Sequence, residues 1–329
     1  MLLGLMGSIV NLHWKWIVLF FVVSQAQAEG YSFIEKFLEA NFASAIVLSD
    51  SDFITLGMVD FDPNGLLHTD NPELGTTDSL KNRQAYSVFA FPYSWDLEHQ
   101  QNASAFFRLS FTQTKEDIQW NEGSGSDDFS QLMIDVSGGY QYHYALSRSW
   151  SLEPSLRAHL MHYQNDVSYR STFGQSVAPF LNGLIFNTSA WAIVYEPQLK
   201  VQYQHDTGWG SWNFFSSGHY FYGYGWGEAN NGDVGNPEGW YVVNGVNLFY
   251  DMTEIMSSKI SMYSSVKRVD LGSDVVKSLD APHYYQITLG GLVAPSVDVP
   301  FVDNIGLGLS MNYGGAFKGG GIVLFLNQR

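Results

Sequence analysis

The chain has 329 residues, of which 32 are acidic and 16 are basic, and a formal net charge of −16. This balance excludes a nucleic-acid partner, because phosphate backbones require clustered Lys and Arg. The absence of cysteine excludes disulfides and thiolate metal sites. Charged residues make up 15% of the chain, against about 25% in ordinary soluble domains. Together with an aromatic content of 16%, this composition fits a membrane β-barrel or a large soluble β-sandwich.

The N-terminal residues have the form of a secretory signal. Lys15 is their only charge, and the apolar core covers only residues 17–23. A spanning helix needs about 20 apolar residues, so a membrane anchor is the weaker interpretation. Ala26 and Ala28 form a small-x-small cleavage site. We therefore expect residues 1–28 to be removed, leaving Glu29 as the new N-terminus.

A short amphipathic segment follows. The sequence Ser32-Phe33-Ile34-Glu35 has the form of a capping box, which marks a helix start. Apolar residues then recur at helical spacing as far as Phe42. The pattern predicts a helix over about residues 33–45 and a linker, the two occupying residues 29–51. Such a helix is too short to be stable alone, so it must pack on the rest of the chain.

From residue 52 the pattern changes to the alternation of β-strands. In residues 191–204 the odd positions are apolar and the even positions are mostly polar. Successive side chains of a strand point to opposite faces, so one face of this strand is apolar and the other must contact water. A strand of this length suits a tilted crossing of a bilayer, which needs about 9–11 residues. The same reading predicts twelve strands: 52–61, 84–94, 103–115, 130–146, 150–164, 186–205, 210–226, 240–251, 257–269, 282–294, 303–313 and 317–327.

The connections between these strands alternate between long polar segments and short turns, which is the arrangement of outer-membrane barrels. We therefore expect an all-β fold: a closed antiparallel transmembrane β-barrel of about twelve strands over residues 52–329. The short N-terminal helix should lie in or near its lumen, although it could also lie flat on the periplasmic membrane surface.

Two strands share a Glu-Pro dipeptide. These are Glu153-Pro154 and Glu196-Pro197, each at the middle of an alternating segment. Proline has no N–H to donate and is unusual in a central strand. The sequence therefore predicts a local bulge or break in the hydrogen-bond ladder at each proline.

The chain resembles the translocator barrels of autotransporters. The strand with Trp191, Tyr195 and the Glu196-Pro197-Gln198 run carries this resemblance, as does the helix directly before the first strand. The C-terminal strand resembles the signal read by the barrel-assembly machinery, through Lys318, Gly320, Val323 and Phe325. We expect Val323 and Phe325 to form the outward, apolar end of this strand. The chain departs from the family in ending after Leu326 on Asn-Gln-Arg instead of an aromatic residue, and in having no room for a passenger between signal and barrel.

The resemblance implies a Gram-negative outer-membrane location after export through a cleaved signal peptide. It implies outer-membrane lipid and lipopolysaccharide as surroundings, and the barrel-assembly machinery and periplasmic chaperones as partners. We expect a monomer without cofactors or bound metals. The first functional hypothesis is a solitary, passenger-less translocator-type barrel with a structural or pore-related role, and the second is a porin-like channel for small solutes.

Polar residues on the inward positions of the strands are the candidate functional set. They predict a hydrated lumen. We also expect Gln198, Lys200, Arg108 and Arg157 to bind the polar face of the helix and Glu35 or Glu39, although any polar barrel interior would contain such residues. The set consists of Arg108, Glu153, Arg157, His159, Glu196, Gln198, Lys200 and Gln202.

An outer-membrane lipid hydrolase is the third hypothesis. It would need a Ser and a His with an amide partner at the lipid interface, but His159, His162 and His219 have no matching Ser or acid motif that we recognise in the sequence. We therefore expect no enzymatic activity and assign no catalytic residue.

Overall fold

The computed structural model describes residues 27–56, 86–97, 102–119, 125–255, 258–279, 281–296, 302–313 and 319–328. Its strands are β1 (Ile54–Leu56), β2 (Tyr86–Asp96), β3 (Ala103–Gln119), β4 (Ser126–Tyr142), β5 (Tyr144–Ala145), β6 (Trp150–Ser168), β7 (Thr188–Thr207), β8 (Gly210–Gly227), β9 (Glu238–Ile255), β10 (Ser258–Ser273), β11 (His283–Ala294), β12 (Ile305–Tyr313) and β13 (Gly319–Leu326). The helices are α2 (Gln27–Ser49), α5 (Thr172–Leu181), the 3₁₀ turn η1 (Ala229–Gly232) and α6 (Asp274–Leu279).

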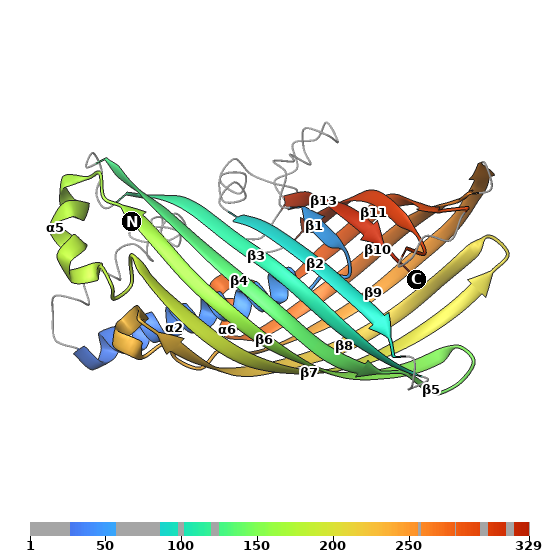
Figure 1. The fold of residues 1–329 in the computed structure, drawn as a ribbon, viewed down its shortest axis with the longest axis horizontal. Helices are drawn as coiled ribbons and strands as arrows, with labels where there is room; N and C mark the ends of the chain where they lie inside the picture. The colour runs from blue at the N-terminus through green and yellow to red at the C-terminus, as the bar shows by residue number, and fades with distance from the viewer. Residues whose placement is uncertain are drawn as a thin grey trace, which may run out of the picture.

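The strands form one closed antiparallel barrel (Figure 1). Strands that follow one another in the chain pair, except that β4 pairs with β6 and not with β5, and β1 pairs with β13. The two-residue β5 continues the line of β4 and also pairs with β6. The described strands therefore occupy twelve positions around the barrel, which confirms the predicted architecture.

Both Glu-Pro dipeptides interrupt a ladder, as predicted. The β7–β8 pairing stops after Tyr195 and resumes at Gln198 in the same register, so that Pro197 is skipped. The β4–β6 ladder ends at Ser155, and β5 resumes it at Leu152, so that Pro154 is skipped. The missing proline N–H explains each gap, and the unchanged register shows a break without a bulge.

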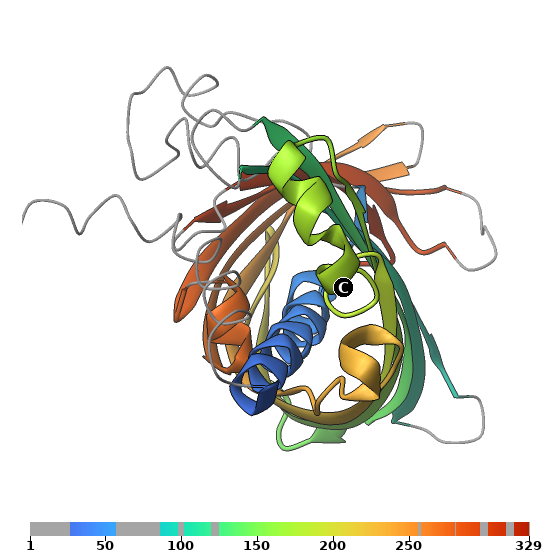
Figure 2. The same ribbon diagram turned by 90° about the vertical axis from the view of Figure 1, so that its left-hand side faces the viewer.

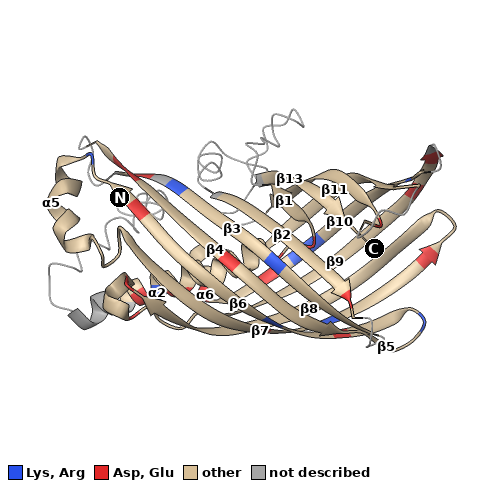
Figure 3. Cartoon of the chain, viewed as in Figure 1, with Lys and Arg blue, Asp and Glu red and all other residues tan. Residues whose placement is uncertain are grey.

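The wall has an apolar outer face and a mixed inner face. On β8, the exposed side chains are mainly Tyr and Trp, whereas alternate positions such as Phe215, Ser217 and His219 are buried. Figure 3 shows few charged residues along the strands. This alternation is the one expected where the outer face meets hydrocarbon and aromatic rings meet the membrane interfaces. Exposed rings on β7 and β8 are Trp191, Tyr195, Phe214, Tyr220, Tyr222, Tyr224 and Trp226.

Helix α2 lies inside the barrel (Figure 2). It spans Gln27–Ser49 and is therefore longer than the predicted 33–45. The expected capping box at Ser32 is wrong as a helix start, because the helix already begins at Gln27. Packing inside the barrel supplies the stabilisation that a capped isolated helix would need. Within the described residues, no helix is both long enough and apolar enough to cross a membrane.

The helix buries its apolar side against the wall. Ile34, Leu38, Phe42 and Ile46 are at most 7% exposed, and the Phe42 ring meets the Tyr163 ring edge-to-face. The facing wall contributes apolar residues from β4 to β11. Where α2 lies, the lumen is therefore a hydrophobic core, so the predicted hydrated lumen is not found over this part of the barrel. Wall members of this cluster include Phe129, Met133, Met161, Val194, Phe221, Val243, Val269 and Leu271.

Three of the long connections fold back around the N-terminal half of α2. Helix α6 and η1 contact it directly, and the Asn236 amide donates to Glu39 Oε1 at 2.7 Å. Helix α5 is capped by Ser171, whose hydroxyl accepts from the Gly174 amide. The sequence predicted loops without helices in these places. Their helices are short and are stabilised by contacts with other parts of the chain, so no local pattern indicates them.

Candidate functional site in the barrel lumen

The segment that joins α2 to β1 is fixed to the wall by ion pairs. Asp50 Oδ1 lies 2.8 Å from Arg108 Nη2 and 3.3 Å from Arg157 Nη1. Both guanidinium groups are nearly buried, with side-chain exposures of 6% and 9%. Burial opposes ionisation of Asp50, but the two guanidinium groups hold the pKa of this carboxyl well below its usual range. A single carboxylate therefore connects the end of the helix to two strands.

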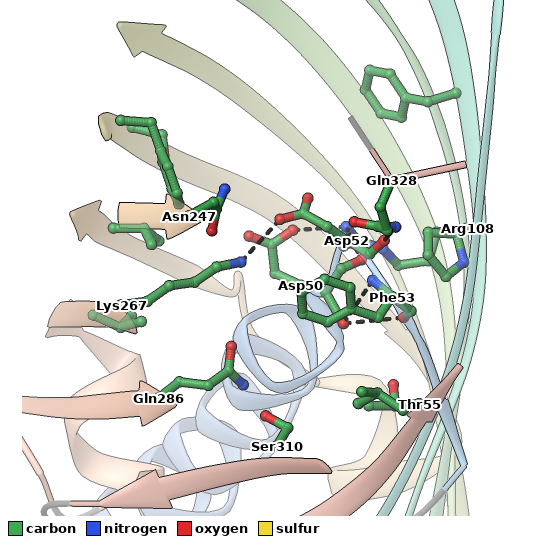
Figure 4. Close-up of a pocket in the computed structure, with 18 of the residues that line it drawn as sticks. Asp50, Asp52, Phe53, Thr55, Arg108, Asn247, Lys267, Gln286, Ser310 and Gln328 are labelled. Atoms are coloured by element: carbon green, nitrogen blue, oxygen red, sulfur yellow. Dashed lines mark hydrogen bonds and ion pairs between the residues drawn. The ribbon is translucent and has the colours of Figure 1, made fainter. Parts of the chain in front are cut away.

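A second ion pair lies two residues further along (Figure 4). Asp52 Oδ2 accepts from Lys267 Nζ at 2.9 Å, and the ammonium group lies over the rings of Phe53 and Phe215. The Lys267 side chain is 9% exposed, whereas that of Asp52 is 69% exposed. The ammonium group lowers the pKa of Asp52 from its ordinary value. Together with Asp50, this contact anchors the linker on opposite sides of the lumen.

Glu196 is the centre of a buried polar network. Its Oε1 accepts from Tyr241 Oη at 2.6 Å and faces His219 Nδ1 at 2.7 Å. Its Oε2 faces His159 Nε2 at 2.8 Å and Arg157 Nη1 at 3.4 Å. With four polar partners, the carboxylate is compensated despite an exposure of 1%. Arg157 links this network to Asp50, and thus to the helix.

The two histidines of this network have different surroundings. His159 lies between Asp135 and Glu196, at 3.0 and 2.8 Å, so each ring nitrogen faces a carboxylate. His219 faces Glu196 with Nδ1 and the hydroxyl of Ser217 with Nε2, at 3.0 Å. A carboxylate only accepts, so the proton of His219 belongs on Nδ1 and Nε2 is left to accept from Ser217.

Sequence reasoning missed the Ser217–His219–Glu196 arrangement. Ser217 and His219 are two residues apart on β8 and thus share its inward face, a signal that the sequence did contain. The position of Glu196 next to them depends on the register between β7 and β8, which the sequence alone does not fix.

Glu153, at the other Glu-Pro dipeptide, organises a smaller cluster. Its carboxylate lies 3.2 Å from Lys200 Nζ and 3.0 Å from His143 Nδ1, and the Ser151 hydroxyl donates to it at 3.2 Å. Gln198 accepts from Ser155 across the same pair of strands. This cluster belongs to the part of the lumen beyond the end of α2.

A cavity of about 410 Å³ occupies this part of the lumen. Arg108, Lys200 and Lys267 line it together with several side-chain amides, and it reaches Gln328 near the end of the chain. Among the described residues, no group of three or more His, Cys, Asp or Glu is placed to hold a metal ion. The cavity therefore suits a polar solute or water. Its amide lining consists of Gln141, Gln198, Gln202, Asn213, Asn247, Gln286, Asn312, Asn327 and Gln328.

All eight predicted lumen residues are found inside the barrel, but they form two groups. Arg108, Arg157, His159 and Glu196 belong to the network that Asp50 joins. Glu153, Gln198, Lys200 and Gln202 surround or line the cavity. The predicted partners of the helix were partly wrong: Arg108 and Arg157 bind Asp50, just after α2, instead of Glu35 or Glu39.

The predicted orientation of the C-terminal strand is also wrong. Val323 and Phe325 were expected to face lipid, but both are fully buried and pack with Phe53 inside the lumen. Phe325 fills space left by Gly290 and Gly308, where an added Cβ would meet its ring. Gly320 of the same strand is buried as well and lines the lumen cavity. Lys318 and Ala26 lie outside the described residues, and Ala28 lies in α2.

Comparisons with known proteins give one family model and several similar solved structures. A family model described as "Solitary outer membrane autotransporter beta-barrel domain" matches residues 39–328. The translocator domain of the autotransporter NalP from Neisseria meningitidis is 12% identical, with 73% of this chain and 78% of that chain covered and a TM-score of 0.40. The β domain of the Bordetella autotransporter BrkA is 11% identical, with 73% and 86% covered and a TM-score of 0.38. No curated protein matches the chain.

Proposed function

Because this chain belongs to the family of solitary outer-membrane autotransporter β-barrel domains, we propose that it works as an outer-membrane barrel that its own N-terminal helix keeps closed. The observation that carries this proposal is the double attachment of α2. Its apolar side packs into the lumen wall, and Asp50 and Asp52 at its end pair with three buried cations. A channel lined by a hydrophobic core does not conduct ions or small solutes.

The orientation of the barrel supports a surface position for the start of the helix. Long connections of outer-membrane barrels face outside and short turns face the periplasm. The long connections that contain α5, η1 and α6 gather at the N-terminal end of α2 (Figures 1 and 2). The helix therefore enters the lumen from the external side, and the cavity beyond its end faces the periplasm.

The porin-like alternative has one observation in its favour, the polar cavity of about 410 Å³. A porin, however, needs a continuous aqueous path, and α2 fills the external half of the lumen. We therefore propose a closed resting state, with solute passage only when the helix leaves the lumen.

We also propose the partners that the family implies. These are outer-membrane lipid and lipopolysaccharide around the wall, and the barrel-assembly machinery and periplasmic chaperones during export through a cleaved signal peptide. A monomer is proposed because the barrel closes on itself through β1–β13 and β4–β6, so that the two-residue β5 is the one described strand that pairs on a single side.

Planar-bilayer conductance tests the closed state. The refolded mature barrel should conduct poorly, and deletion of residues 29–45 should raise its conductance several-fold. Lys36→Gln, a change at an exposed helix residue, is the matched control and should stay closed. We call α2 and the linker that ends at Asp52 the plug. Equal conductance with and without the helix would refute the proposal that the plug closes the lumen. The location is tested separately: the mature protein should fractionate with the outer membrane and shift on gels when heated.

A further inference from the structure

We propose that the lumen contains a catalytic site in which Ser217 is the nucleophile, His219 the general base and Glu196 the group that orients the base. Its substrates would be small acyl esters that enter the lumen cavity. This proposal goes beyond a closed barrel and departs from the sequence-based expectation of no enzymatic activity. Neither idea depends on the other, because Asp50 and Asp52 pair with Arg108, Arg157 and Lys267 and not with any of these three residues. Glu196 is joined to the helix attachment only through Arg157.

The geometry is that of a nucleophile–base–acid chain. His219 Nε2 lies 3.0 Å from Ser217 Oγ, and His219 Nδ1 lies 2.7 Å from Glu196 Oε1. Both distances are within the range of a base that hydrogen-bonds a nucleophile while a third group orients it. Such triads are recognised by geometry and roles and not by their order in the chain.

The surroundings hold the base in the required position. Tyr241 stacks on the His219 ring with centroids 4.0 Å apart, and its hydroxyl donates to the same Glu196 oxygen. This carboxylate is 1% exposed and His219 is 5% exposed. A fixed ring whose Nδ1 proton is held by a carboxylate presents a free Nε2 lone pair to the serine hydroxyl.

The opposite strand supplies groups that could stabilise an oxyanion. Lys200 lies directly across from Ser217 in the β7–β8 register, and Gln198 lies across from His219. The oxygen of Gln198 accepts from Ser155, which leaves its NH₂ group as a donor on the cavity side. A side-chain amide and a nearby cation are both known kinds of transition-state donor for acyl transfer.

Access and size define the class of substrate. Ser217, His219, Gln198 and Lys200 all line the cavity of about 410 Å³, whereas Glu196 does not. The reactive ends of the triad thus face the cavity, and its acid is shielded behind His219. The volume limits substrates to small esters, and Lys200 and Lys267 favour those with a negative charge.

The reaction balances with water as the only co-reactant. Ser217 Oγ attacks the carbonyl carbon and its proton passes to His219 Nε2. The bond from the carbonyl carbon to the alcohol oxygen breaks, and the alcohol leaves with that proton. Water then attacks the acyl-serine, again giving a proton to His219, which returns it to Ser217 Oγ as the carboxylic acid departs.

Covalent labelling tests the site. The folded barrel in micelles is treated with diisopropyl fluorophosphate, which transfers its phosphoryl group to an activated serine and releases fluoride. Mass spectrometry should find one adduct per chain, on Ser217. Ser217→Ala should abolish it, and Ser216→Ala, the neighbour on the opposite face of β8, should not. Hydrolysis of p-nitrophenyl acetate should fall in parallel.

The role of the base is tested by His219→Gln, which should slow labelling by about 100-fold or more. His162→Gln is its control, because His162 contacts the ring of the outward Trp191 and does not line the cavity. Folding of each variant is checked by the heat-induced gel shift. If His219→Gln does not fold, the small Ser217→Ala change still decides the matter. Absence of an adduct, an adduct that survives Ser217→Ala, or equal labelling of a folded His219→Gln variant would overturn the proposal.

Discussion

Asp50 accepts a hydrogen bond from Arg108 at 2.8 Å, and this contact joins the last residues of the plug to β3 of the wall. The same carboxylate oxygen lies 3.3 Å from Arg157. Arg157 in turn reaches Glu196 at 3.4 Å. A residue outside the barrel strands thus completes the charge balance of a network that belongs to the wall.

Asp50→Asn should therefore loosen the plug. It leaves two nearly buried guanidinium groups with one carboxylate fewer, and loss of one partner of a buried pair costs about 3 to 5 kcal/mol. We expect a lower unfolding midpoint in urea and more frequent channel openings in planar bilayers. Asp251→Asn removes half of an exposed pair with Lys259 and should change stability by less than about 1 kcal/mol. Equal effects of the two changes would contradict the assigned role of Asp50.

Phe42→Ala should weaken the same attachment through packing. Phe42 is fully buried and meets Tyr163 edge-to-face at 6.3 Å. Truncation of a buried Phe to Ala costs about 3 to 5 kcal/mol of stability. Because Phe42 lies on α2, this change destabilises the state in which the helix is docked in the lumen. The measurement is conductance together with protease sensitivity of α2. Phe180→Ala on α5, where the side chain is 72% exposed, should leave both unchanged.

The wall could be predicted from the sequence because period-two alternation over long segments has few other solutions. The alternation located the strands and the inward face of β7. The missing N–H groups of Pro154 and Pro197 predicted the breaks in the hydrogen-bond ladders. Local chemistry was enough for these features.

Two kinds of feature could not be predicted, because they depend on register or on contacts between distant segments. The extension of α2 to Ser49 depends on the lumen wall that packs around Ile46 and Val47. The pairing of Asp50 with Arg108 and Arg157 depends on how deeply the helix enters. In the C-terminal strand, the pattern did not show which face points inward. Val323 and Phe325 fit an assembly-signal pattern but occupy the inward face, and a change of register by one residue exchanges the two faces of a strand.

Phe325→Ala should consequently act on stability through the core of the barrel. The Phe325 ring contacts the rings of Phe53 and Tyr263, with centroids 5.2 and 5.1 Å apart. Truncation to Ala leaves a cavity and lowers the free energy of unfolding by about 3 to 5 kcal/mol. We expect a lower unfolding midpoint in micelles. Leu307→Ala, at a lipid-facing position that is 59% exposed, is the matched control and should change the midpoint much less. A larger effect at Leu307 would show that the assigned faces are reversed.

Acidification should release the plug. The pKa values of Asp50 and Asp52 are both lowered from the ordinary value of 3.8, so both carboxylates bind protons more weakly when the helix is docked than when it is detached. The stabilisation that the two carboxylates give to the docked helix is therefore complete above pH values near that ordinary pKa, and it is lost as the pH falls below it. Lys267, Arg108 and Arg157 then lack their carboxylate partners. We expect bilayer conductance to stay low near neutral pH and to rise as the pH falls below about 4. The double variant Asp50→Asn, Asp52→Asn should conduct more at neutral pH and should lose most of this pH dependence, and an unchanged pH profile in that variant would assign the effect to other groups.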